Sequence, residues 1–322
     1  MPLADRSPLI QIRPFLNSDP PALVAIWNAQ PESKCLARQL TTPTFEHFVL
    51  AKPYFDREGI LVAVHDGRPV GFVHAGFAPN DSHSSIDKNV GTICLLNILP
   101  DFDSVELGTQ LLQAAETYLS SRGVSQILGG PVSPLTSFYH GLSSIGEAAG
   151  VLDDDRSTQE LFRAAGYEES DRHVVLRRDL TAFRPGFDRK QRVLQRNFDV
   201  FVDLETDLSD WWELCRYGPL PRCAFEAIDR SSNTKVARVN WWDQAFSGAA
   251  LQSSVAFSNI EVPETIRRTG IGTLLMNEAM KQLKKSGAFF ATAQVRAGNE
   301  GAQAFFNSLG FTELTRGTTF RK

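Results

Sequence analysis

The sequence predicts two tandem domains of the α/β (α+β layered) class, each with a mixed sheet flanked by helices. Three observations lead to this fold. The chain has 322 residues, more than the roughly 100–200 residues of one typical domain. Hydrophobic residues make up 42% and charged residues 22%, which is ordinary for a globular protein, so each half can bury a core. Two stretches, 98–123 and 261–287, repeat one pattern at a fixed offset.

The repeat spans a turn, a helix and the glycine that ends the helix. Gly108 and Gly272 stand 164 positions apart, and the same offset relates the leucines and alanines that follow. LFRAAGY at 161–167 also resembles FFNSLGF at 305–311, but there the offset has fallen to 144. The first copy therefore holds roughly 20 extra residues, within the Gly-, Pro- and Ser-rich stretch 129–155. A period this long indicates domain duplication.

The first domain, 1–182, is defined by apolar periodicity between turn signals. Alternating or clustered apolar residues predict strands, and apolar positions spaced by three or four predict helices. In order we expect a strand at 10–15, a helix at 20–30, a hairpin at 60–77 that turns at Asp66–Gly67, a buried strand at 91–100, a helix at 105–121, a strand at 126–130, the insert, a helix at 157–165 and a closing strand at 173–180.

The second domain, 183–322, repeats this order after a linker at 181–192. Its elements are expected to start near Arg196. They are strands at 200–205, 222–229, 234–242 and 252–262, a Trp-rich helix start at 211–212, helices at 271–286 and 301–308, a strand at 289–296 and a terminal strand. The shared order of β and α elements supports sheets covered by helices in both halves.

Charge and cysteine content exclude several classes of function. With 33 Lys or Arg against 37 Asp or Glu, the net charge is −4, so we expect no nucleic-acid partner. The four cysteines form no CxxC pair and have no His at zinc spacing, so we expect reduced thiols and no metal site. The N-terminus does not resemble a signal peptide and no apolar run could cross a bilayer. We therefore expect a cytoplasmic protein without a membrane partner.

The strongest chemical signal is a glycine-containing turn between a strand and a helix. The strand SSVAFSNIEV is followed by ETIRRTGIGT, which contains Arg267-x-x-Gly270-x-Gly272. Glycines permit a tight turn and a close approach of the main chain to a ligand. The N–H groups at the start of the helix form an anion site that the helix dipole reinforces. This turn suits a pyrophosphate, and the net charge of +5 over 264–322 agrees with an anionic ligand. Taken alone, the pattern fits a strand-to-helix turn without a ligand equally well.

This turn, together with a second segment, resembles a known family. VPETIRRTGIGTLL followed by Asn299-x-x-Ala302-x-x-Phe305-Phe306-x-x-Leu309-Gly310-Phe311 is similar to the two signature segments of GNAT-type acyl-CoA N-acyltransferases. The resemblance covers 254–322 and continues as a weaker echo in the first copy. It implies two tandem GNAT-like domains, a layout similar to that of mycothiol synthase, and acetyl-CoA as the cosubstrate.

The resemblance also implies which residues meet the cosubstrate. The end of the strand would bind the thioester and pantetheine through main-chain groups, the turn would surround the pyrophosphate, and the second segment would face the pantetheine arm. The residues so assigned are Ile260, Glu261, Val262, Arg267, Arg268, Gly270, Ile271, Gly272, Thr273, Asn299 and Phe306.

The sequence departs from the family pattern where an acid or a base is needed. Phe306 stands where the family often has a Tyr that protonates the departing thiolate. The only tyrosine after residue 180 is Tyr217, far from that motif in sequence, and all six histidines lie in the first copy. An amine must still lose a proton to react. Glu261 is the first candidate for this base, and a solvated or packing side chain fits it equally well. Glu226 and Asp229, on the preceding strand, are the reserve candidates.

The first copy has acidic residues where the second has its anion site. Glu106 stands at the position of Gly270, with Asp101 and Asp103 nearby, and like charge opposes pyrophosphate binding. This copy is therefore expected to serve as a scaffold or substrate wall. Its insert contains Tyr139 and His140, which either touch a substrate or belong to a packed lid without chemistry.

The sequence thus predicts an acetyl-CoA-dependent N-acetyltransferase that transfers an acetyl group directly to a small-molecule or peptide amine. The cosubstrate would bind in the second domain, with an acceptor groove between the copies. One alternative is a non-catalytic CoA-binding or regulatory protein, which Phe306 favours. Another is a Fem-type aminoacyltransferase, which the intact RRTGIG turn disfavours, because its aminoacyl-tRNA donor has no CoA pyrophosphate.

Overall fold

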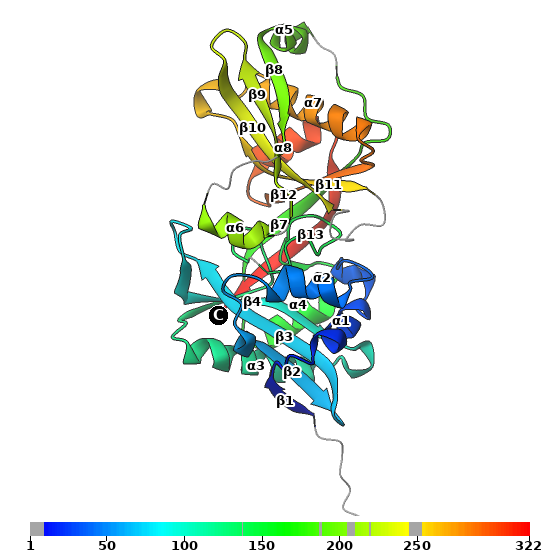
Figure 1. Ribbon diagram of the computed structural model, residues 1–322, viewed down its shortest axis with the longest axis vertical. Helices are drawn as coiled ribbons and strands as arrows, with labels where there is room; N and C mark the ends of the chain where they lie inside the picture. The colour runs from blue at the N-terminus through cyan, green and yellow to red at the C-terminus, as the bar shows by residue number, and fades with distance from the viewer. Residues whose placement is uncertain (1–9, 137, 187–188, 205–209, 219, 245–252) are drawn as a thin grey trace, which may run out of the picture.

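The computed structural model describes residues 10–136, 138–186, 189–204, 210–218, 220–244 and 253–322. In this part of the chain, 13 strands form one continuous mixed sheet, with helices on its faces. The two halves are stacked along the long axis of the molecule, and strands from both meet in the middle (Figure 1).

The N-terminal half follows the predicted order of elements. Two helices cover one face of its sheet and two cover the other. Its strands are β1 (Gln11–Pro14), β2 (Ile60–His65), β3 (Arg68–Pro79), β4 (Ile86–Ile98), β5 (Gln126–Gly129), β6 (Val151–Leu152) and β7 (Glu168–Asp179). Its helices are α1 (Pro20–Asn28), α2 (Thr42–Phe45), α3 (Val105–Ser121) and α4 (Arg156–Ala164), with short 3-10 or π turns at Glu32–Lys34, Glu46–Leu50, Arg57–Gly59 and Pro100–Phe102.

The C-terminal half contains one helix more than the sequence predicted. This helix, α5 (Arg189–Asn197), begins inside the stretch expected to be a linker. The other elements are β8 (Phe198–Asp203), α6 (Trp211–Tyr217), β9 (Cys223–Asp229), β10 (Thr234–Asp243), β11 (Ser254–Glu261), a 3-10 turn (Glu264–Ile266), α7 (Ile271–Lys285), β12 (Phe290–Arg296), α8 (Glu300–Ser308) and β13 (Thr312–Arg321).

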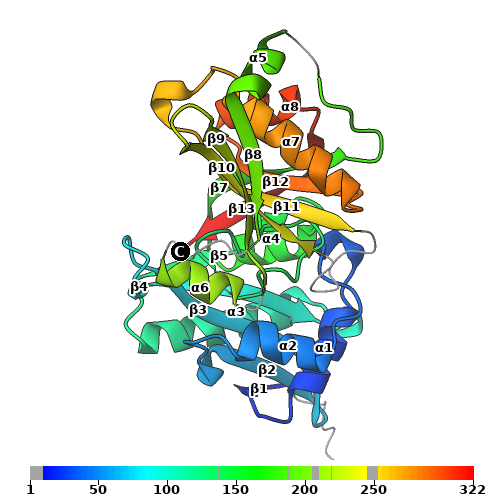
Figure 2. The ribbon, with the colours of Figure 1, turned by 45° about the horizontal axis from the view of Figure 1, so that its top comes forward.

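The two halves exchange their last strands. The sheet order is β1-β2-β3-β4-β5-β13-β7-β12-β11-β10-β9-β8, so β13 lies beside β5 of the N-terminal half and β7 lies beside β12 of the C-terminal half. Val174 and Leu176 of β7 are buried in the C-terminal core, whereas Phe320 of β13 is buried in the N-terminal core. The exchanged pair crosses the middle of the molecule in both views (Figures 1 and 2). Each half therefore contributes one strand to the sheet and core of the other half.

The exchange differs from the expectation that the strand at 173–180 closes the first domain. An apolar strand with an antiparallel edge fits either neighbouring sheet, so local sequence does not choose between them. A further core continues across the halves, because Tyr217, Leu220, Trp242 and Ala256 pack with α1 and α2. The halves are joined by sheet hydrogen bonds and by a common core.

Candidate active site

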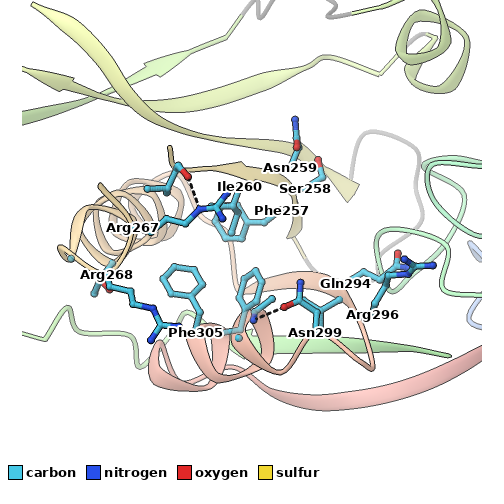
Figure 3. A pocket seen from close by; sticks show the side chains of 18 of the residues that line it. Phe257, Ser258, Asn259, Ile260, Arg267, Arg268, Gln294, Arg296, Asn299 and Phe305 are labelled. Atoms are coloured by element: carbon cyan, nitrogen blue, oxygen red, sulfur yellow. Dashed lines mark hydrogen bonds between the residues drawn. The ribbon is translucent and has the colours of Figure 1, made fainter. Parts of the chain in front are cut away.

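The site lies where β11 and β12 separate. These parallel strands pair only over Ser254–Phe257 and Phe290–Ala293, although both continue beyond. A cavity of about 870 Å³ occupies the opening. Figure 3 shows it between Phe257–Ile260 of β11 and the helix that carries Asn299 and Phe305. The strand edges facing the opening keep main-chain groups available for a ligand.

A bulge in β11 decides which side chains face this cavity. Val239 of β10 pairs with Ile260, but the next residue, Asn240, pairs with Ser258, so Asn259 is the extra residue. Asn259 adopts a left-handed conformation with φ of 47°. A bulge re-aims the side chains that follow it. Ile260 and Val262 consequently face the cavity and pack beside the C-terminal core.

The turn before α7 leaves the start of that helix open. Arg268 has φ of 62° and Gly270, the N-cap, has φ of 101°; at Gly270 any L side chain would be strained. No side chain caps the helix, and Leu274 N–H donates to Gly270 O at 2.9 Å. The amides of the first turn therefore remain open toward the cavity, as in an anion site.

Basic side chains surround this open helix start. Arg267 donates from Nε to Val262 O at 2.9 Å and from Nη1 to Glu264 at 3.1 Å, and Arg268 lies on the same side of the cavity (Figure 3). Lys190 of α5 donates to Arg268 O at 3.4 Å, and Gln191 donates to Gly270 O at 3.3 Å. The sequence predicts a linker at both of these positions. The basic run RKQR at 189–192 is the one local signal for an anion contact here, but it lies far from the turn at 267–273 in sequence.

Helix α8 closes the cavity opposite β11. Asn299 caps this helix by accepting a hydrogen bond from Ala302 N–H at 3.0 Å (Figure 3). Phe305 lines the cavity beside it. Phe306 also lines the cavity, is 5% exposed and packs against Phe311 at a ring distance of 5.1 Å. This wall is aromatic and places no phenolic hydroxyl at residue 306.

A second cavity, of about 620 Å³, meets the first at the opening in the sheet. The two share six lining residues: Phe257, Ser258, Asn259, Gln294, Val295 and Arg296. The remaining walls come from both halves of the chain. They are formed by β5, the insert after it, β7 and β13, and they include Ser133, Glu147, Asp171, His173, Thr319 and Arg321. A ligand in the first cavity can therefore reach one in the second.

This arrangement agrees with the family that matches the sequence. The profile described as "Acetyltransferase (GNAT) family" matches twice, over residues 22–133 and 206–311, which together make about two thirds of the chain. The chain belongs to the acetyltransferase (GNAT) family. The predicted acyl-CoA N-acetyltransferase activity and the tandem duplication are thereby confirmed. Enzymes of this family use acetyl-CoA as cosubstrate. No curated protein matches the sequence.

Solved structures share the whole fold of this GNAT protein at low identity. A GCN5-related glucosamine N-acetyltransferase region of a fungal multi-domain GH3 β-N-acetylglucosaminidase superposes with a TM-score of 0.69 and 18% identity. That match covers 99% of this chain but 38% of the other. A tandem GNAT protein from the clavulanic acid biosynthesis pathway gives 0.68 and 12%, with 98% of each chain covered. A GCN5-related N-acetyltransferase from Sphaerobacter thermophilus gives 0.64 and 14%, covering 100% and 96%.

Most of the residues assigned to the cosubstrate lie together in the first cavity. Its lining includes Ile260, Val262, Arg267, Arg268, Gly270, Gly272, Thr273, Asn299 and Phe306. Ile271 does not line it: its side chain is 4% exposed and packs in the C-terminal core. Only the main chain of Ile271 is available to a ligand.

Neither predicted base lines either cavity. Glu261 lies three residues beyond Ser258, about 10 Å along an extended strand. Its carboxylate accepts a hydrogen bond from Asn259 Nδ2 at 2.6 Å and borders a separate depression. Glu226 on β9 forms an ion pair with Lys235 at 2.5 Å. A general base must reach the reacting amine directly or through one water, so neither position supports that role.

The candidates in the insert are buried in packing. Tyr139 forms a 2.9 Å hydrogen bond with His74 and stacks on Trp27. His140 lies between the rings of Tyr217 and Trp242, at 4.7 and 5.0 Å. Neither Tyr139 nor His140 lines the two cavities. The packed-lid alternative describes their positions.

The strand exchange brings a histidine to the site. His173 belongs to the first copy in sequence, as all six histidines do, but β7 lies beside β12 in the sheet, and His173 lines the second cavity. Burial lowers the pKa of His173 below its usual value; Asp171 opposes this shift, and Arg296 adds to it. For this histidine, position along the chain did not predict position in space.

Two further polar side chains near the second cavity come from α6 and from the insert of the first copy. Tyr217 of α6, although far from the motif in sequence, hydrogen-bonds Ser258 Oγ at 3.1 Å, and burial raises its pKa to about 12. Glu147 is 6% exposed and pairs with Arg216 at 3.0 Å. Burial raises the pKa of Glu147, but Arg216 and its other polar partners outweigh burial and hold the pKa below its usual value.

The corresponding place in the N-terminal half has a different structure. Ser104 caps α3 by accepting from Leu107 N–H at 3.2 Å, and Glu106 lies in the first turn. The cavity between β4 and β5 holds only about 80 Å³. Lys34 fills part of this region and donates to Leu96 O at 3.2 Å. The helix start that is open in α7 is therefore closed in α3.

Among the described residues, no group of three or more His, Cys, Asp or Glu side chains is arranged to hold a metal ion. No helix in the same part of the chain has the length and apolarity needed to cross a membrane.

Proposed function

We propose that acetyl-CoA binds in the first cavity and that its acetyl group passes directly to an amine in the second. The observation that carries this proposal is the shared wall of the two cavities, at Phe257–Asn259 and Gln294–Arg296. One cavity ends at an open helix N-terminus with basic neighbours, and the other is polar and lined by both halves. A ternary complex would place the thioester between them.

The residues around the first cavity suit each part of the cosubstrate. The open amides of α7, with Arg267, Arg268 and Lys190, provide donors and positive charge for the pyrophosphate. The unpaired edge of β11 beyond Phe257 offers main-chain groups to the pantetheine arm. Phe305 and Phe306 provide an apolar wall beside it. The thioester carbonyl would lie at the opening between β11 and β12.

We infer that the acceptor is a small polar amine or the exposed amine of a peptide. The charged groups of the second cavity are balanced, since Glu147 is paired with Arg216 and Asp171 with Arg296 at 2.6 Å. A lining of this kind suits hydroxyl-rich or zwitterionic amines better than long apolar ones. One structural relative is described as a glucosamine N-acetyltransferase region, so amino sugars belong among the first compounds to test.

In this proposal the N-terminal half is a substrate wall and not a second cofactor site. The capped start of α3 and the acidic side chains near it oppose a pyrophosphate. The boundary at residues 182 and 183 then separates the two copies in sequence, while β7 and β13 cross between them in space. A non-catalytic CoA-binding protein is the second candidate, favoured by the absence of a hydroxyl at Phe306.

The test is release of CoA thiol from acetyl-CoA in the presence of a panel of amines: amino sugars, amino acids, polyamines and short peptides. Turnover of at least one amine is expected. Ser170→Trp, which fills the acceptor cavity, is expected to abolish turnover while acetyl-CoA still binds. Ser286→Trp, on the exposed far end of α7, is the matched control. Binding without turnover of any amine would favour the non-catalytic alternative.

A further inference from the structure

His173 occupies the acceptor face of the sheet, next to the opening. Its Cα pairs with Arg296 on β12 and with Gly317 on β13. Residues directly opposite in an antiparallel pair share one face, with Cβ atoms about 5 Å apart. Their sequence neighbours, Val174 and Val295, are buried on the other face in the C-terminal core. The imidazole therefore faces the second cavity together with Arg296.

The opening between β11 and β12 lies on the same face of the sheet as His173. Val175 pairs with Gln294, two residues further along each strand, and Gln294 is the first residue of β12 beyond its pairing with β11. Across the opening, Ser258 lines the same cavity and is held there by Tyr217. An acceptor nitrogen at the opening thus has Ser258 on one side and the β7–β12 wall with His173 on the other.

Among the described residues of this wall, the imidazole is not part of an ion pair, whereas both carboxylates are. His173 is 6% exposed, and its Nδ1 has no hydrogen-bond partner among the residues that the structure describes. The charged groups around the cavity are Asp171 on its own strand, Arg296 on β12, Glu147 in the insert and Arg321 on β13. Asp171 is engaged by Arg296, and Glu147 by Arg216.

We propose that His173, supplied to the C-terminal active site by the strand exchange, is the general base of the acetyl transfer. This inference rests on the proposed function. The neutral acceptor nitrogen attacks the thioester carbonyl carbon, a C–N bond forms, and the C–S bond breaks with its electron pair leaving on sulfur. The proton of the resulting cationic nitrogen passes to the imidazole and from there to solvent. The lowered pKa of His173 keeps the ring neutral, and hence able to accept this proton, at neutral pH.

The test compares His173→Gln with His47→Gln, an exposed histidine remote from both cavities. Each variant is assayed by thiol release with the most active amine of the panel. For His173→Gln, kcat/KM at pH 7 is expected to fall by about 100-fold or more, with acetyl-CoA affinity unchanged within twofold. His47→Gln is expected to match the wild type. Thermal unfolding of both variants checks that each is folded.

Two pH-dependent readouts separate a base from a structural role. Wild-type kcat/KM is expected to fall below an inflection under pH 6.5, because the protonated ring no longer accepts a proton, and the variant should lack this inflection. In His173→Ala, added imidazole should restore activity in proportion to its neutral form. A loss under threefold, a deficit that neither pH nor imidazole changes, or a parallel loss of acetyl-CoA affinity would each overturn the assignment. A wild-type enzyme inactive with every amine would instead overturn the proposed function.

Discussion

Replacing Gly270 by alanine should separate the cost of backbone strain from the loss of cosubstrate binding. Gly270 and Gly287 flank the two ends of α7 with similar backbone angles, φ of 101° and 94°. An L residue at such an angle costs about 1–2 kcal/mol, so Gly270→Ala and Gly287→Ala should destabilise the fold to a similar extent. For a chain of this size, that is a fall in Tm of a few degrees, about 2–4 °C per kcal/mol.

The two sites differ in what a methyl group would meet. At Gly287 nothing lies within 4 Å, whereas at Gly270 the new Cβ would lie 3.0 Å from Leu194 Cδ1 and 3.3 Å from Gln191 Nε2. The methyl group would therefore push α5 away from the turn and disturb the donors around the open helix start. We expect the Kd for acetyl-CoA to rise about tenfold or more in Gly270→Ala, which is about 1.4 kcal/mol, and to stay unchanged in Gly287→Ala.

The assay is isothermal titration of acetyl-CoA into both variants, together with thermal unfolding of each. Similar Tm values with a difference in Kd would support the site at the start of α7. Equal affinity in the two variants would refute the reasoning, because the same strain would then be present without any local effect on the cosubstrate.

Three further predictions concern a hydrogen bond at the opening, a buried ion pair and the cap of α3. Tyr217→Phe removes the hydrogen bond that holds Ser258 at the opening, so kcat/KM should fall by up to about tenfold with little change in Tm. Glu147→Gln leaves Arg216 buried without its partner, and denaturant unfolding should show a loss of about 3–5 kcal/mol at pH 7. Because the folded pKa of Glu147 is depressed, its stabilisation is present above the unfolded pKa and lost as pH falls through the folded value, so the difference between variant and wild type should shrink in acid. Ser104→Ala should destabilise the protein by about 1 kcal/mol through loss of a helix cap, while calorimetry still gives one acetyl-CoA per chain.

Local chemistry is the part of this site that could be predicted from the sequence. The turn before α7 could be predicted because all of its signals lie in one short stretch of sequence: glycines at fixed spacing, a strand before them and a helix after them. In the structure Gly270 has a positive φ, and the helix start has no side-chain cap. Ile271, which the same local pattern assigns to the cosubstrate, instead buries its side chain in the C-terminal core.

Contacts between segments that are distant along the chain could not be predicted from one sequence. The strands that pair with β7 depend on which sheet edge it meets, and its apolar pattern fits both halves equally well. The sequence alone therefore does not show that His173 lies beside the C-terminal sheet. Tyr217 reaches Ser258 only because α6 packs on the core shared by both halves. Glu261 is a candidate base in the sequence because it stands on the signature strand. In the structure its carboxylate borders a separate depression, because the bulge at Asn259 changes which side chains face the opening and because Glu261 lies three residues beyond Ser258.

The central claim is that one acetyl-CoA binds in the C-terminal half, at the open start of α7. Titration calorimetry of acetyl-CoA into the wild type, Gly270→Glu and Gly287→Glu tests it most directly. We expect binding at one site per chain in the wild type and in Gly287→Glu. We expect that binding to be lost in Gly270→Glu, because this variant has at position 270 the glutamate that the first copy has at position 106. Unchanged binding in Gly270→Glu would contradict the account and place the cosubstrate elsewhere on the molecule.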